Sequence, residues 1–136
     1  IADDMFQQML LYPEDYDVLV TPNLNGDYLS DACAAMVGGV GMVPGANIGD
    51  AIALFEPTHG TAPRLKNPEY ANPISLILSG AMMLDYIGWT EAADAVRRCV
   101  EMTVMHGYVT PDLKARMKDV KEVSAFGFVE KALENV

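Results

Sequence analysis

Basic side chains and long apolar runs are scarce in this chain of 136 residues. Nine lysines and arginines oppose 19 aspartates and glutamates, which gives a formal net charge of -10. Nucleic acid and membrane surfaces are therefore poor partners, because both are anionic. The longest apolar stretch, 73–84, stops at Asp85, well short of the roughly 20 residues that span a bilayer. We predict a buried helix there.

Cysteine is also scarce, and its placement argues against two kinds of site. Cys33 and Cys99 stand far apart in the sequence, without the spacing of zinc ligands or of a disulfide framework. Reduced thiols are expected, and with them a cytoplasmic location. The chain starts at Ile1 with a helical pattern and no leader sequence, so we expect it to be cut from a longer protein.

The composition is 51% hydrophobic and 21% charged, which is typical of one compact folded domain. Helices are expected from Asp3 to about Pro13 and over 27–37, 73–87, 90–106 and 124–133, and strands over 18–21, 40–43 and 51–55. Residues 23–26 and 44–49 are expected as loops. Asn72 and Thr90 are expected to cap two helices, and Gly88 to end the first of these. The alternation predicts an α/β fold.

Two carboxylates are candidates for a metal site. Asp27 and Asp31 are four residues apart, so a helix that starts near Asp27 places both on one face. Like charges so placed repel each other by a few tenths of a kcal/mol, and a divalent ion such as Mg²⁺ would offset this. The alternative is that Asp27 only caps the helix and that Asp31 is solvated. Because caps are far commoner than metal sites, spacing alone favours the cap.

A short loop offers groups that could bind an anionic nucleotide. The run 59–64 combines an imidazole, a glycine, a hydroxyl and a guanidinium, all of which suit phosphate recognition. The alternative is a turn in which His59 makes an ordinary structural hydrogen bond. The glycines near residue 40 do not form a dinucleotide-binding fingerprint, because Pro44 takes the place of the third glycine.

Three longer motifs identify a family. The runs 23–31, 44–49 and 56–63, followed by 88–94, closely resemble bacterial NADP-dependent isocitrate dehydrogenases, and the resemblance covers the whole chain. Isopropylmalate dehydrogenases share much of this frame but differ at positions 24 and 25. The resemblance implies the isocitrate/isopropylmalate dehydrogenase-like fold, which lacks the Rossmann fingerprint.

The resemblance also implies an activity and a metal site. The family oxidises and decarboxylates isocitrate to 2-oxoglutarate and CO2, a step of the tricarboxylic acid cycle, with hydride transfer to NADP, and it works as a homodimer. Asp27 and Asp31 match its metal ligands, and Asp3 matches a third ligand contributed by the other subunit. Mg²⁺ or Mn²⁺ would bind there and chelate the substrate.

For the coenzyme, the resemblance implies a second set of residues. The matched positions that hold the adenosine part are His59, Gly60, Thr61, Ala62, Pro63, Arg64 and Leu65. Asn72 matches a residue that contacts adenine. The residues that bind isocitrate, together with a catalytic Tyr and Lys, lie upstream of Ile1 in the family. We therefore expect residues 1–136 to be the C-terminal portion of the enzyme, with no catalytic residue and no turnover alone.

Coenzyme choice is expected to be less strict than in the family. The positions that usually hold four contacts to the 2′-phosphate carry Arg64, Leu65, Pro111 and Ala115. Only Arg64 retains a suitable charge, although Lys66 and Arg116 are possible substitutes. We predict NADP over NAD by a reduced margin, with dual use possible. Three alternatives stay open: an NAD-linked isopropylmalate or homoisocitrate dehydrogenase, a non-catalytic regulatory subunit, and an acidic interaction module.

Overall fold

The computed structural model describes residues 1–63 and 65–136. Arg64, for which a phosphate contact is predicted, lies outside the described residues. Two compact units make up the chain, Ile1–Gly39 and Val40–Val136, where the length predicted one. Among the described residues, no helix has the length and apolar character needed to cross a membrane.

The first unit contains two helices, α1 (Ala2–Leu11) and α2 (Asn23–Met36), with a short 3-10 turn, η1 (Pro13–Asp15), after α1. α1 confirms the first predicted helix. The strand predicted at 18–21 is wrong: within the described residues no strand pairs with it, and Val18 and Val20 are 80% and 94% exposed. A β-favouring run forms a strand only where a neighbour completes its hydrogen bonds.

α2 begins earlier than its apolar pattern predicts. Pro22 is the N-cap, with extended backbone, and its carbonyl oxygen accepts a 2.9 Å hydrogen bond from the N–H of Gly26. Residues 23–26 are therefore helical, and Asp27 is not the cap, because it already lies in the second turn. The predicted glycine stop is confirmed, since Gly38 and Gly39 have φ of 120° and 115°, which favour glycine after a helix.

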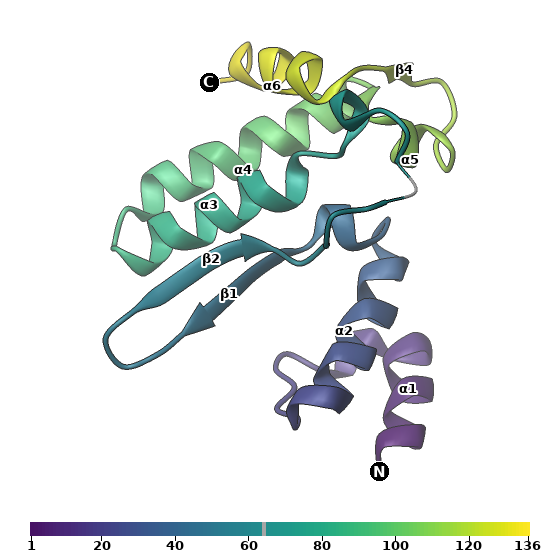
Figure 1. Cartoon of the computed structure of the whole chain (residues 1–136), viewed down its shortest axis with the longest axis vertical. Coiled ribbons are helices and arrows are strands. Elements are labelled where there is room, and N and C mark those ends of the chain that lie inside the picture. The colour runs from purple at the N-terminus through teal and green to yellow at the C-terminus, as the bar shows by residue number, and fades with distance from the viewer. Residues whose placement is uncertain (64) are drawn as a thin grey trace. The chain divides into compact units, whose positions relative to one another are not determined.

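The second unit is built around one apolar helix. Its elements are η2 (Val40–Met42), β1 (Pro44–Ile48), β2 (Ala53–Pro57), η3 (Pro68–Tyr70), α3 (Ile74–Tyr86), α4 (Thr90–Met105), β3 (Tyr108–Val109), α5 (Pro111–Lys114), β4 (Lys121–Glu122) and α6 (Ala125–Leu133). α3 packs against α4 and against the β1–β2 hairpin (Figure 1). β3 and β4 form a separate parallel pair. This mixture of helices and strands confirms the α/β class.

The hairpin corrects two predictions. Residues 44–48, expected in a loop, form β1 and pair antiparallel with β2, while 40–42 form a 3-10 turn where a strand was predicted. Gly45 explains the first error, because a Cβ atom there would lie 2.8 Å from the backbone oxygen of Glu56. Its N–H also donates to the hydroxyl of Ser79. Glycine, a loop signal in sequence, here permits a close backbone approach.

The predicted caps of α3 and α4 lie one residue away from the observed ones, because Pro73 is the N-cap of α3, whereas the predicted stop at Gly88 is confirmed. The Oδ1 atom of Asn72 accepts a 2.9 Å hydrogen bond from the N–H of Ile74, and Gly88 has φ of 86°. Thr90 is the first helical residue of α4, because Trp89 is the N-cap. Ser124 caps α6, and its Oγ atom accepts from Gly127.

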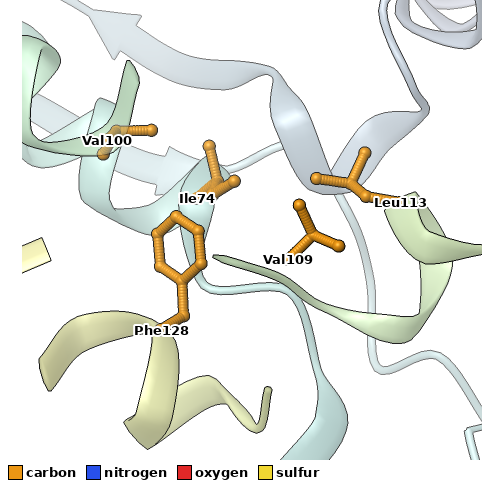
Figure 2. Packing of buried hydrophobic residues seen from close by; sticks show 5 residues of the cluster. All are labelled: Ile74, Val100, Val109, Leu113 and Phe128. Carbon is orange, nitrogen blue, oxygen red and sulfur yellow. The ribbon is translucent and has the colours of Figure 1, made fainter. Parts of the chain in front are cut away.

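A cluster of buried side chains holds five elements together. Figure 2 shows Phe128 of α6 against the start of α3, with the others around them: Ile74, Val100, Val109, Leu113 and Phe128. Burial of a large apolar side chain contributes roughly 1.5–3 kcal/mol. The cluster therefore fixes where α3 begins, and with it the position of Asn72.

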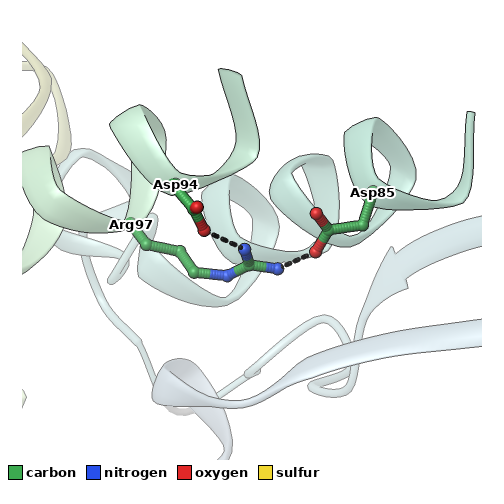
Figure 3. Close-up of polar contacts among 3 residues, drawn as sticks. All are labelled: Asp85, Asp94 and Arg97. Carbon is green, nitrogen blue, oxygen red and sulfur yellow. Dashed lines mark hydrogen bonds and ion pairs between the residues drawn. The ribbon is translucent and has the colours of Figure 1, made fainter. Parts of the chain in front are cut away.

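An ion-pair network joins α3 to α4. The guanidinium of Arg97 donates to Asp85 of α3 and, at 3.1 Å, to Asp94 on its own helix (Figure 3). The hydrogen bond to Asp85 is the main reason that the pKa of Arg97 is raised. Because all three side chains are more than a third exposed, we assign this network about 1 kcal/mol or less.

Candidate coenzyme and metal sites

The loop that follows β2 is anchored at its first residue. The N–H of Thr58 donates to Oγ of Ser75 at 3.3 Å, and its hydroxyl lies 3.1 and 3.0 Å from the carbonyl oxygens of Val40 and Val43. The hydroxyl of Ser75 in turn donates to the oxygen of Val43 at 2.6 Å. Ser75 is fully buried in α3. The start of the loop is therefore tied to η2, to the residue after it and to α3.

Next to this anchor lies a pocket of about 320 Å³. Its lining residues come from η2, the loop after β2, η3, the two residues that follow η3 and the start of α5: Val40, Gly41, His59, Gly60, Thr61, Ala62, Leu65, Pro68, Tyr70, Ala71, Asn72, Pro111 and Asp112. Small-molecule sites typically measure about 300–1,000 Å³ and combine apolar walls with a few polar groups. The pocket matches that description and has room for part of a dinucleotide.

Most of the predicted coenzyme residues meet in this pocket. His59, Gly60, Thr61, Ala62, Leu65 and Asn72 line it, although Asn72 is separated in sequence from the rest. Pro63 does not line it, and Arg64 is outside the described residues. Pro111 lines the pocket, whereas Lys66, Ala115 and Arg116 do not. Residues of the loop after β2 and Asn72 therefore lie at one pocket. In the sequence, only the family resemblance had linked them to the same ligand.

The polar groups of the loop have defined partners. Nδ1 of His59 lies 3.0 Å from the carbonyl oxygen of Gly60. Since a carbonyl oxygen can only accept, this nitrogen donates and Nε2 remains for another partner. Ala62 has φ of 46°, uncommon for a residue with a side chain, and its oxygen accepts from the N–H of Leu65 at 2.8 Å. The loop is thus a closed turn.

Two further polar residues at the pocket were missed in the sequence. Nδ2 of Asn72 donates to Oδ2 of Asp112 at 2.9 Å, and the hydroxyl of Thr110 donates to Oδ1 of the same carboxylate at 2.6 Å. The only sequence signal was that Thr110 and Asp112 flank a proline at a helix start. Such residues normally serve the helix itself, so they gave no reason to expect a contact forty positions away.

The candidate metal carboxylates lie in the first unit. Asp27 and Asp31 share one face of α2 and are exposed, and among the described residues neither forms an ion pair. Hard carboxylate oxygens without a cationic partner suit Mg²⁺ or Mn²⁺. Asp3 is also exposed, in the first turn of α1, and its Oδ1 accepts from the N–H of Asp4. The donor types fit a divalent ion.

Within a single copy of the chain these groups do not form a complete metal site. Across residues 1–63 and 65–136, no three His, Cys, Asp or Glu side chains are grouped closely enough to hold an ion. Metal held by Asp27 and Asp31 would need its remaining ligands from water, from a substrate or from another chain. Magnesium commonly binds through one or two carboxylates with such additional ligands.

Comparison with known proteins gives a consistent result over the whole chain. The family model for isocitrate/isopropylmalate dehydrogenase matches residues 1–131. The chain is 50% identical over 136 residues to an isocitrate dehydrogenase [NADP] of Archaeoglobus fulgidus, and 48% identical over the same length to that of Helicobacter pylori. It covers 33% and 32% of those two proteins.

Solved structures agree with the sequence matches. An isocitrate dehydrogenase from Methylococcus capsulatus superposes with a TM-score of 0.90 at 43% identity, over 99% of this chain and 39% of that one. A beta-decarboxylating dehydrogenase from Thermococcus kodakarensis gives a TM-score of 0.82 at 37% identity, over 98% and 38%. The chain spans about a third of the length of the curated relatives it matches. It belongs to the isocitrate/isopropylmalate dehydrogenase family.

Proposed function

We propose that residues 1–136 are the C-terminal portion of an NADP-dependent isocitrate dehydrogenase. The complete enzyme would oxidise and decarboxylate isocitrate to 2-oxoglutarate and CO2. One observation carries this proposal above the others: residues 59–62, Leu65 and Asn72 line a single pocket. The names of the 48–50% identical relatives support the choice of isocitrate and NADP.

In this proposal the pocket holds the adenosine part of the coenzyme. The hydroxyl of Thr61 and the backbone of Gly60 are available to its polar groups, and the amide of Asn72 contacts adenine. NADP itself supplies the hydride acceptor. Thr58 and Ser75 keep the loop in position, so less conformational entropy is lost when the coenzyme binds.

The carboxylates of α2 take the metal. Asp27 and Asp31 would hold Mg²⁺ or Mn²⁺, with Asp3 contributed by a second copy in a homodimer. When bound, the ion supplies stabilisation of the negative charge that develops on the substrate as CO2 leaves. The protein's own role is to keep two oxygen donors four residues apart on one rigid helix, open to the substrate. The complete enzyme would act in the cytoplasm, as part of the tricarboxylic acid cycle.

A second candidate function has one specific observation in its favour. The described lining residues include the carboxylate of Asp112 but no lysine or arginine. A pocket that lacks a cation binds a 2′-phosphate poorly. An NAD-linked dehydrogenase acting on isopropylmalate or homoisocitrate is therefore the alternative, and Arg64 decides between the two.

An activity assay of the complete protein tests the proposal. Isocitrate and isopropylmalate are each offered with NADP and with NAD in the presence of Mg²⁺, and formation of the reduced nicotinamide is followed by its absorbance. We expect the highest kcat/KM with isocitrate and NADP, and loss of activity when a chelator removes the metal. A higher kcat/KM with isopropylmalate, or with NAD, would overturn the proposal.

A further inference from the structure

A chain of hydrogen bonds fixes the amide of Asn72 from two sides. Its Oδ1 atom accepts from the backbone N–H of Ile74 at 2.9 Å, and its Nδ2 atom donates to Oδ2 of Asp112 at 2.9 Å. The hydroxyl of Thr110 donates to the other carboxylate oxygen at 2.6 Å. Asp112 thus accepts from two neutral donors, and among the described residues it forms no ion pair.

This arrangement allows only one orientation of the amide. A rotation of the amide by 180° would point NH2 at the N–H of Ile74 and the carbonyl oxygen at the carboxylate of Asp112. Both contacts would then be between like groups, two donors or two acceptors. The space beneath is also restricted, because a Cβ atom on Gly41 would lie 3.2 Å from Cβ of Asn72. The side chain is therefore held as a rigid unit at the pocket wall.

The fixed amide has hydrogen-bonding capacity left over. Within residues 1–63 and 65–136, one lone pair of Oδ1 has no partner, and the further donor contact of Nδ2 is a 3.5 Å hydrogen bond to the sulfur of Met42, a weak acceptor that a ligand can replace. An acceptor beside a donor matches the amino group and adjacent ring nitrogen of adenine. In hypoxanthine a carbonyl replaces the amino group, so the pattern is reversed and the same amide meets like groups.

We propose that Asp112, supported by Thr110, is a positioning residue that orients the Asn72 amide for recognition of adenine. This inference rests on the proposed function, because it assumes that the pocket holds the adenosine part of the coenzyme. In this proposal the carboxylate of Asp112 strengthens the binding of the coenzyme. Simple electrostatics gives the opposite sign, since removal of a negative charge should improve the binding of an anionic coenzyme.

The test measures steady-state kinetics of the complete protein with NADP and with its hypoxanthine analogue. Asp112→Ala should raise KM for NADP about tenfold, the usual effect of losing a hydrogen bond to a charged group, with kcat nearly unchanged. The preference for NADP over the analogue should fall. Asp112→Asn, which keeps an oxygen acceptor, should restore most of the affinity, and Thr110→Val should have a smaller effect than Asp112→Ala.

Two variants separate positioning from other causes. In an Asn72→Ala background, Asp112→Ala should cause no further rise in KM, because the carboxylate acts through the amide. Glu101→Ala removes an exposed acid of α4 and controls for net charge, so it should leave KM unchanged. Thermal denaturation shows whether each variant is folded. If Asp112→Ala does not fold, the Asp112→Asn variant tests the role of the carboxylate instead.

The outcomes distinguish this inference from the function on which it rests. If the unsubstituted protein does not use NADP, both are overturned. If it does, and if Asp112→Ala leaves KM and the preference for adenine unchanged or improves binding, only the role of Asp112 is overturned. The role is also overturned if KM for NADP in the double variant rises by the product of the effects of Asn72→Ala and Asp112→Ala. Independent contributions of this kind would exclude action of Asp112 through the Asn72 amide.

Discussion

Ser75→Ala tests whether the coenzyme loop depends on its buried anchor. The hydroxyl of Ser75 is fully buried, accepts from the N–H of Thr58 at 3.3 Å and donates to the oxygen of Val43 at 2.6 Å. After the substitution, Val43 still has the hydroxyl of Thr58 as a donor at 3.0 Å. The N–H of Thr58 loses its partner, because the methyl group that remains in alanine cannot accept a hydrogen bond.

The magnitude follows from these contacts. The substitution removes two part-buried hydrogen bonds of the Ser75 hydroxyl, each of which contributes about 0.5–1.5 kcal/mol, while alanine is favoured over serine in a helix by about 0.5 kcal/mol. We expect the free energy of unfolding to fall by about 1–2 kcal/mol, with weaker coenzyme binding because Thr58 adjoins His59.

Urea unfolding followed by circular dichroism measures the loss. Ser30→Ala is the matched control, because the hydroxyl of Ser30 is exposed and, among the described residues, hydrogen-bonds only to the oxygen of Asp27 on the same helix. Its effect should be close to zero. Equal effects of the two substitutions, or no loss with Ser75→Ala, would refute the argument that the hydroxyl holds the loop.

Three further predictions concern the chemistry. Asp27→Asn in the complete enzyme should abolish the response to Mg²⁺ and most turnover while circular dichroism stays unchanged; normal activity would exclude Asp27 as a metal ligand. Arg64→Asp should shift the ratio of kcat/KM toward NAD, by roughly 10- to 150-fold if a charge-assisted bond is lost, and an unmoved ratio would exclude its phosphate contact. The 136 residues alone should not oxidise isocitrate, so turnover near 1 per second or above, a rate typical of enzymes, would show that the catalytic residues are not all upstream.

Local signals were sufficient to place the helices, although the start of α2 and the caps of α3 and α4 differ from the predicted ones. The acidic first turn of α1 and the glycines after α2 and α3 each act on their own segment, so neighbouring residues determine the outcome. The errors fell where a distant contact decides. Residues 44–48 became a strand because Gly45 lets β1 approach Glu56 closely, and 18–21 formed none for lack of a neighbouring strand among the described residues.

The candidate site divides in the same way. The 59–65 loop is a continuous motif, so the resemblance identified it together with Asn72. Asp112 carries no motif, and its contact with Asn72 arises only because the packing around Phe128 and Leu113 brings α5 to the start of α3. Sequence patterns indicate which residue types are present, whereas a hydrogen bond across forty positions depends on tertiary packing.

The claim that the pocket holds the adenosine part of the coenzyme is tested most directly by a crystal structure of the complete protein with NADP bound. We predict that the adenine lies between the 59–65 loop and α5, with its amino group and ring nitrogen within hydrogen-bond distance of the Asn72 amide. Adenosine bound away from His59 and Asn72, with this pocket empty, would contradict the account.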